Sequence, residues 1–274
     1  MSTATASTVL LADPPPETAA SPTDNCDPLD APVELKVPPW LVELPPESAR
    51  THITELPRAT RVAKRVLDVL VAGTLLVLTL PIMLVAAVAI KLTSPGPVIF
   101  YQTRVGLNRR RHDRSGNNPV RVCRRRQRNF GRPFTIFKLR TMHVAVDTDG
   151  PRTAQQGDDR VFRVGRFLRR TRIDELPQLI NVLRGEMSMV GPRPECIDYM
   201  EDLTARIPNY TERLRLKPGL TGIAQIEAGY ANDLDSYRRK IALDLMYLRN
   251  CTVQNDVKIM LRTGKVMLTG FGAL

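Results

Sequence analysis

The feature that most constrains this chain is an uncharged apolar run that extends from Val69 to Ile90. A helix of about 20 apolar residues is long enough to cross the hydrocarbon core of a bilayer. A run of this length is typical of a membrane segment rather than of a core helix in a soluble protein. The sequence therefore predicts one helix inserted in a membrane.

Pro81 stands in the middle of this run, where a proline removes one backbone hydrogen bond and bends the helix. Both flanks are basic, with Lys64 and Arg65 before the run and Lys91 after it. The charge asymmetry that orients a spanning helix is therefore missing. A spanning helix and a kinked helix that enters and leaves by one leaflet fit these residues equally well. Asp68 is expected at the headgroup level, or paired with a neighbouring base.

A second constrained stretch, residues 169–194, holds two adjacent carboxylates, Asp174 and Glu175. An amphipathic helix is predicted directly after them, because apolar residues recur at i, i+3, i+4 and i+7, namely Leu176, Leu179, Ile180 and Leu183. Gly185 is a stop signal for this helix. The carboxylates therefore lie at the start of the predicted helix, with Asp174 near its N-cap.

The carboxylate pair has two interpretations. In one, Asp174 only caps the helix and Glu175 only complements the helix dipole. In the other, the acids, the neighbouring arginines and the free helix N–H groups handle phosphate chemistry. Arg169 precedes the pair, and Arg193 stands between two prolines whose fixed φ sets its direction.

The stretch D-E-L-P-Q…G-P-R-P resembles the signature of the bacterial sugar transferases, the monotopic phosphoglycosyl transferase superfamily. Other segments are similar to motifs of the same family: K-R-V-L-D at residues 64–68, P-G-P-V-I-F-Y-Q-T-R-V-G at 95–106, G-R-P-F-T-I-F-K-L-R-T-M at 131–142 and K-P-G-L-T-G-I-A-Q-I at 217–226. The chain departs from the pattern where the family commonly supplies an arginine after the last motif. That arginine is either absent here or replaced by Arg238 or Arg239.

The resemblance implies an α+β, mainly helical fold in a monotopic membrane protein. Pro81 would mark the break of a re-entrant helix, and a small cytoplasmic catalytic domain would carry interfacial amphipathic helices. Strands are expected at residues 98–101 and 135–139, and helices at 196–205, 235–249 and 256–268. The expected location is the cytoplasmic face of the bacterial inner membrane.

Three regions are expected along the chain. Residues 1–58 are rich in Pro, Ala, Ser and Thr, which predicts a disordered tail. Trp40 within it is expected to be a loop anchor, with a short docking or interfacial patch as the alternative. Residues 59–93 form the membrane-inserted helix, and residues 94–274 form the catalytic domain. An arginine-rich insertion at 109–130 interrupts that domain.

The resemblance also implies an enzyme that transfers a sugar-1-phosphate from a UDP-sugar to undecaprenyl phosphate and releases UMP. This is an initiating step of exopolysaccharide, capsule, O-antigen or glycoprotein glycan synthesis. Asp174 would attack the β-phosphorus and form a phosphosugar-aspartyl intermediate, and Glu175 would help to hold Mg²⁺. The residues expected to contact substrate phosphates are Lys138, Arg140, Arg169 and Arg193.

The net charge of +12 predicts an anionic partner. Nucleic acid is not expected, because the arginine-rich insertion has almost no aromatic residues for base stacking. Anionic lipid headgroups are the expected partner of this insertion, and a plain solvated loop is the alternative. The four scattered cysteines form no C-x-x-C pair and suggest neither a disulfide framework nor a zinc site.

A basic membrane-anchored scaffold that binds lipid or nucleic acid without catalysis is the alternative function. It explains the charge and the apolar run, but not the D-E-L-P-Q and G-P-R-P segments. The sequence does not define the sugar or the oligomeric state, and a homodimer is compatible with it.

Overall fold

The computed structural model describes residues 35–48, 50–108, 130–143, 158–207, 209–228 and 234–269. The predictions for residues 1–34 of the tail and for nearly all of the arginine-rich insertion therefore fall outside the described residues.

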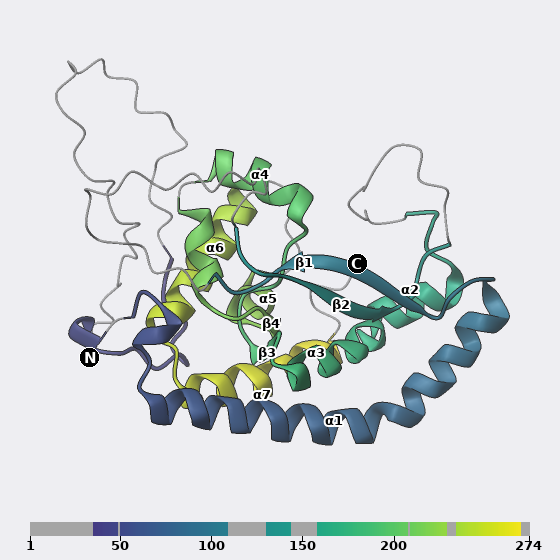
Figure 1. Cartoon of the computed structure of the whole chain (residues 1–274), viewed down its shortest axis with the longest axis horizontal. Coiled ribbons are helices and arrows are strands. Elements are labelled where there is room, and N and C mark those ends of the chain that lie inside the picture. The colour runs from purple at the N-terminus through teal and green to yellow at the C-terminus, as the bar shows by residue number, and fades with distance from the viewer. Residues whose placement is uncertain are drawn as a thin grey trace, which may run out of the picture.

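The described chain is mostly helical (Figure 1). Its α-helices are α1 (Arg58–Thr93), α2 (Arg163–Arg170), α3 (Leu179–Arg184), α4 (Ile197–Arg206), α5 (Ile223–Glu227), α6 (Leu234–Arg249) and α7 (Val253–Thr269). Short 3₁₀ helices are η2 (Pro46–Ser48), η3 (Ile53–Glu55), η4 (Ile173–Gln178) and η5 (Tyr210–Arg215). The predicted mainly helical fold with one long apolar helix is confirmed.

Four strands form two small sheets. β1 (Ile99–Val105) and β2 (Pro133–Leu139) pair as an antiparallel ribbon, while β3 (Ser188–Val190) and β4 (Gly219–Thr221) pair in parallel. Gly191 and Gly219 let the second pair approach closely, because a Cβ added to Gly219 would lie 2.1 Å from the Gly191 amide nitrogen. The β3–β4 pair delivers the G-P-R-P segment to the region around η4.

Helix α1 is 36 residues long and, by length and composition alone, could cross a membrane. Only 11% of its most apolar window is buried, so large side chains such as Val77 and Leu84 are exposed. An exposed apolar surface of this extent is typical of a region that contacts a membrane or another protein rather than water. Figure 1 shows α1 running along the lower edge of the molecule and bending upward in its second half, the half that contains Pro81.

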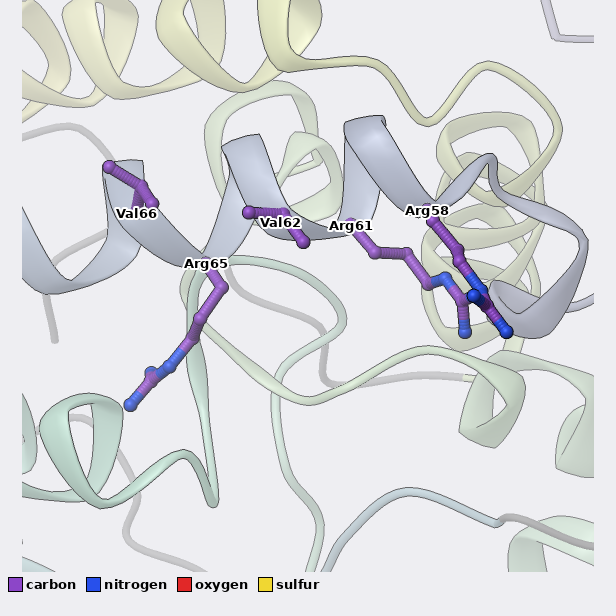
Figure 2. A pocket seen from close by; sticks show the side chains of 5 residues that line it. All are labelled: Arg58, Arg61, Val62, Arg65 and Val66. Carbon is purple, nitrogen blue, oxygen red and sulfur yellow. The ribbon is translucent and has the colours of Figure 1, made fainter.

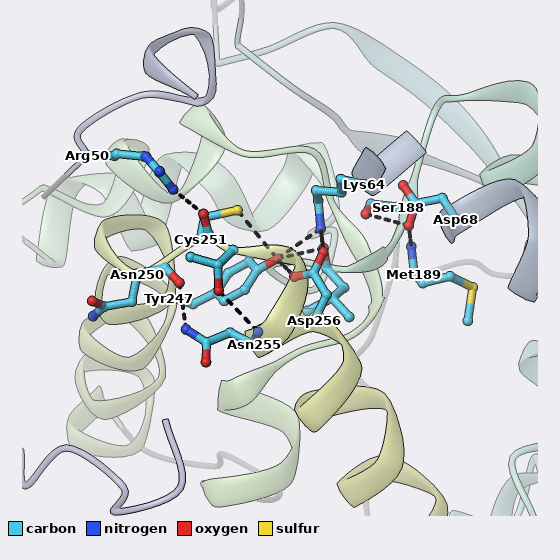
Figure 3. Close-up of polar contacts among 12 residues, drawn as sticks. Arg50, Lys64, Asp68, Ser188, Met189, Tyr247, Asn250, Cys251, Asn255 and Asp256 are labelled. Atoms are coloured by element: carbon cyan, nitrogen blue, oxygen red, sulfur yellow. Dashed lines mark hydrogen bonds and ion pairs between the residues drawn. The ribbon is translucent and has the colours of Figure 1, made fainter. Parts of the chain in front are cut away.

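The start of α1 is attached to the folded domain by buried polar groups (Figure 3). Asp68 accepts hydrogen bonds from the Ser188 hydroxyl at 3.0 Å and from the Met189 amide at 2.8 Å. The expectation that Asp68 pairs with an adjacent base is wrong, because its hydrogen-bond partners come from β3, while its position at the headgroup level stays a prediction. Its side chain is buried because β3 provides the donors that a carboxylate needs away from water.

Lys64 makes a second buried attachment from the first turns of α1. Its ammonium group lies 2.5 Å from Asp256 on α7 and donates to the Tyr247 hydroxyl and to the carbonyl of Val190 (Figure 3). These contacts tie α1 to α6, α7 and the end of β3.

The structure differs from the predicted tail over residues 35–57. Leu41 and Leu56 of this segment are buried in the main core. The side chain of Asn255 donates to the Val42 carbonyl and accepts from the Val42 amide, so the backbone of Val42 is hydrogen-bonded without a strand. The Trp40 ring lies 4.4 Å from the Arg262 guanidinium, so Trp40 anchors this loop, as expected. Buried leucines and the tryptophan therefore order a segment whose overall composition suggested disorder.

Candidate active site

Glu175 on η4 lies between two cations that come from distant parts of the chain. Lys138, near the end of β2, places its ammonium nitrogen 2.9 Å from Glu175 Oε1. Arg193, three residues after β3, places Nη2 2.6 Å from the same oxygen and Nη1 3.4 Å from Oε2. A forked guanidinium contact of this kind is among the stronger hydrogen-bonded ion pairs. The fold thus brings together three of the predicted site residues.

Asp174 lies directly before this cluster and is 8% exposed. Its Oδ1 is buried and has no hydrogen-bond partner among the described residues. The carboxylates lie at the start of a helix, as expected, but this is a 3₁₀ helix whose N-cap is Arg172, and Asp174 is its second residue. A buried carboxylate oxygen without a partner is costly, and such groups are concentrated at functional sites.

The two carboxyls differ strongly in acidity. Burial and, to a smaller extent, the charge of Glu175 raise the pKa of Asp174 to about 6, against the opposing charges of Lys138, Arg169 and Arg193. Burial would also raise the pKa of Glu175, but the charges of Arg193 and Lys138 outweigh it and hold that pKa well below its ordinary value. Adjacent carboxyls whose pKa values are pushed apart can take different roles. Glu175 is therefore a fixed anion, and Asp174 titrates near neutral pH.

Arg172 produces the sharp turn before the two acids. Its φ is 59°, a left-handed conformation that is rare for a residue with a side chain. Strain of this type costs about 1–2 kcal/mol and is found preferentially at functional sites. The turn leads from α2 into η4, and η4 packs against β2, which carries Lys138. Nothing in the sequence identified this turn, because an arginine is not a turn signal.

Two of the expected phosphate-binding arginines lie away from the Glu175 oxygens. Arg140 is buried and donates to the carbonyls of Ser94, Pro95 and Pro97 and to the Ser94 hydroxyl. It therefore fastens the chain that leaves α1, and four of its donors are already used. Arg169, at the end of α2, lies close enough to Asp174 for its charge to lower the Asp174 pKa.

The site fits Mg²⁺ only as an ion that arrives with substrate phosphates. Among the described residues, no group of three or more His, Cys, Asp or Glu side chains is arranged to hold a metal. Mg²⁺ often uses one or two carboxylates together with phosphate oxygens and water. Glu175 can supply one such carboxylate while Lys138 and Arg193 remain in place, because each carboxylate oxygen can accept more than one contact.

The family model for bacterial sugar transferases matches residues 59–270, which is most of the chain. This chain belongs to the bacterial sugar transferase family. Membership confirms the family predicted from the motifs, and with it the prediction of an enzyme of the phosphoglycosyl transferase type.

Curated relatives of this transferase carry consistent names. The UDP-glucose:undecaprenyl-phosphate glucose-1-phosphate transferase of Caulobacter vibrioides is 44% identical over 243 residues, which are 88% of this chain and 80% of that protein. The UDP-N-acetylgalactosamine-undecaprenyl-phosphate N-acetylgalactosaminephosphotransferase of Aeromonas hydrophila is 43% identical over 77% of this chain but only 44% of its own length. The exopolysaccharide production protein PSS of Rhizobium leguminosarum bv. phaseoli is 36% identical, over 74% of this chain and 93% of that protein. The transferase therefore spans less than half of some relatives and most of others.

The structure distinguishes the two arginines named as replacements for the missing family arginine. Arg239 is exposed on α6. Arg238 is largely buried, and its Nε and Nη2 have no hydrogen-bond partner among the described residues, although Nη1 lies 3.5 Å from Asp235. Of the two, Arg238 has free buried donors that an acceptor could satisfy.

The sequence did not single out Arg213 of η5, although the Arg213 side chain contacts the backbone of Arg193. The Arg213 guanidinium donates to the backbone carbonyl of Arg193 at 2.9 Å and pairs with Asp244 on α6. No local pattern around Arg213 indicates that it is buried, so only the structure could reveal this contact.

Proposed function

We propose that the transferase moves a sugar-1-phosphate from a UDP-sugar to undecaprenyl phosphate and yields undecaprenyl-diphosphate-sugar and UMP. The names of the relatives, which pair UDP-sugars with undecaprenyl phosphate, support both substrates. The observation that carries the chemistry is the buried, unpartnered Oδ1 of Asp174 beside a Glu175 held by two cations. This transfer initiates synthesis of an exopolysaccharide, capsule, O-antigen or glycoprotein glycan.

The reaction proceeds in two displacements at one phosphorus atom. A carboxylate oxygen of Asp174 attacks the β-phosphorus of the UDP-sugar, and UMP leaves with the electron pair of the broken P–O bond. An oxygen of undecaprenyl phosphate then attacks the phosphosugar-aspartyl intermediate, and the Asp174 carboxylate leaves. Dividing the transfer in this way lets a soluble and a lipid substrate use the same nucleophile in turn.

Lys138 and Arg193 stabilise the negative charge that develops on the departing phosphate. Both are already within hydrogen-bonding distance of Glu175, so they are oriented before the substrate binds. Arg169 adds a third positive charge near Asp174. Mg²⁺ would neutralise the diphosphate when bound, with Glu175 as its protein ligand.

We further propose that α1 is re-entrant and lies on the cytoplasmic side of the bacterial inner membrane. Both ends of α1 are attached to the same folded domain, through Lys64 and Asp68 at its start and through Arg140 at its end. A straight spanning helix would separate these attachments by the thickness of the bilayer. A helix bent near Pro81 keeps both on one side. Exposed Phe167 of α2 supports an interfacial position for that helix.

Anionic lipid headgroups are the proposed partner at the start of α1. A shallow pocket of about 320 Å³ is lined there by Arg58, Arg61, Val62, Arg65 and Val66 (Figure 2). Arg65 already donates to two carbonyls at the end of α3, whereas Figure 2 shows the side chains of Arg58 and Arg61 pointing away from Arg65. Two arginines beside exposed valines suit a phosphate headgroup whose acyl chains follow the apolar helix.

The proposed reaction is tested by the nucleotide that is released. Purified transferase receives UDP-glucose or UDP-N-acetylgalactosamine with undecaprenyl phosphate and Mg²⁺, and UMP rather than UDP should appear. Without the lipid acceptor, about one UMP per active site should be released while the protein gains the mass of a phosphosugar. Release of UDP, or a phosphosugar adduct that still forms on an Asp174→Asn protein, would rule out this mechanism.

A further inference from the structure

The backbone of residues 190–194, here called the Arg193 loop, is held by side chains and amides from outside it. The β3–β4 ladder ends at its start, where the Gly191 amide donates to the Thr221 carbonyl at 2.9 Å, and its two prolines have no N–H group with which to continue it. Its carbonyls accept further hydrogen bonds. Lys64 donates to residue 190 at 3.2 Å, the Gly219 amide to residue 192 at 2.8 Å, Arg213 to residue 193 at 2.9 Å and Arg104 to residue 194 at 3.3 Å.

Among these donors, Arg213 is the most completely enclosed. It is 5% exposed, and its Nε donates to Asp244 at 3.0 Å while Nη1 donates to the Tyr210 hydroxyl at 3.0 Å. Its Nη2 lies 2.9 Å from the Asp244 carboxylate and also donates to the carbonyl of Arg193. A buried ion pair is costly to desolvate and adds little stability unless all its groups are satisfied. Here the geometry leaves one N–H directed at a single backbone atom of the active-site loop.

We propose that Arg213, held in place by Asp244, is a positioning residue that fixes the Arg193 loop so that the Arg193 guanidinium stays on Glu175. This inference rests on the proposed function, in which Arg193 stabilises charge at the phosphate. The side chain of Arg193 is 39% exposed, so neighbouring atoms alone do not confine it. Its direction is therefore set mainly by the backbone from which it projects.

Arg213→Lys tests this role. A lysine keeps a positive charge beside Asp244, but one ammonium group cannot reproduce the forked contacts with Asp244, Tyr210 and the carbonyl of Arg193. A misplacement of about 1 Å can cost roughly 100-fold in rate, so we expect kcat/KM for UMP release to fall by about 10- to 100-fold. Arg215→Lys is the matched control. It lies on the same 3₁₀ helix and pairs with Glu212 near the surface, so its activity should stay within about twofold of wild type.

A double-mutant cycle separates positioning from general damage. If Arg213 acts through Arg193, Arg213→Lys should cost less than about threefold in an Arg193→Gln background. A merely structural role would make the two losses multiply. Arg215→Lys combined with Arg193→Gln should resemble Arg193→Gln alone.

The split between kcat and KM gives a second readout. If Arg193 stabilises charge in the transition state, Arg213→Lys and Arg193→Gln should both lower kcat and leave the KM for the UDP-sugar within about twofold of wild type.

Multiplying losses, or a loss in Arg213→Lys that falls on KM alone, would overturn the proposal. If Arg213→Lys does not fold, Tyr210→Phe repeats the cycle, because it removes only the hydroxyl that accepts from Arg213 Nη1. Failure of the Asp174 mechanism is recognised separately, by an Asp174→Asn enzyme that stays active. In that case, coupling between positions 213 and 193 would still report on the loop.

Discussion

Arg193 Nη2 lies 2.6 Å from Glu175 Oε1 and joins two sequence motifs that are 18 residues apart. This contact places the G-P-R-P segment over the D-E-L-P-Q segment. It also engages Glu175, while Oδ1 of the adjacent Asp174 has no hydrogen-bond partner among the described residues. The two acids can take different roles because Lys138 and Arg193 form their ion pairs with Glu175.

Asp174→Asn should abolish transfer and stabilise the protein. The Asp174 pKa rises from 3.8 to about 6 on folding, so its ionised form destabilises the fold. Its favourable contribution is complete below pH 3.8 and is lost as pH rises through 6. The variant should therefore melt a few degrees above wild type at pH 8, with the difference vanishing toward pH 4. Activity should fall by several orders of magnitude. A variant with near-normal turnover would contradict the nucleophile role.

Glu175→Gln should shift the pH profile of whatever activity remains. The wild-type acid limb of kcat/KM is expected near pH 6, because Asp174 must be ionised to attack. The charge of Glu175 raises the Asp174 pKa, so its removal should move the limb to lower pH. We expect a severe loss of rate that excess Mg²⁺ partly restores. A limb that moves to higher pH would exclude this electrostatic relationship.

Reporter tags placed before residue 35 and after residue 269 should be accessible from the same side of the membrane. This follows from the attachment of both ends of α1 to one domain. Labelling in spheroplasts and in inverted vesicles makes the measurement, and opposite accessibility would end the re-entrant proposal. Pro81→Leu, which removes the bend, should convert part of the population to opposite accessibility.

Replacing Arg58 and Arg61 with Gln should weaken flotation with vesicles that contain phosphatidylglycerol, most clearly at low salt. Binding to neutral phosphatidylcholine vesicles should change little, because the apolar face of α1 is unaltered. The control is Arg239→Gln, at an exposed arginine on α6, which measures how much binding is lost when positive charge alone is removed. Equal losses in all variants would leave the pocket without a specific partner.

Arg238→Lys should raise the KM for the UDP-sugar, whereas Arg239→Lys should not. Of these two arginines, Arg238 is the one with buried donors that have no partner among the described residues. Lysine retains the charge but loses the planar fork. Initial rates at varied UDP-glucose give the comparison. Equal KM values in the two variants would indicate that neither arginine replaces the one missing from the family motif.

Much of the fold could be predicted from local patterns in the sequence. Helices α6 and α7 begin and end within three residues of their predicted limits, because apolar periodicity records which face is buried. Gly185 ends α3 with a φ of 78°, as a glycine stop signal predicts. The motifs also identified Lys138 and Arg193, which the structure brings to Glu175.

The remainder depended on contacts between distant residues. Asp68 resembled an interfacial charge until β3 supplied its donors. Arg140 resembled a phosphate ligand, yet it fastens the chain after α1. An arginine that binds carbonyls and one that binds phosphate have the same sequence appearance, so only their neighbours distinguish them.

The attachment of α1 bears on how this protein can be cut or recombined. Residues Ala72 and Ile90 of α1 are fully buried, and Lys64 neutralises Asp256 inside the domain. A fragment that starts after residue 93 would expose apolar core and leave Asp256 as an uncompensated buried charge, a loss of about 3–5 kcal/mol for such a pair. A water-soluble catalytic fragment cannot be made by trimming the anchor, and chimaeras should exchange α1 together with β3 and α7.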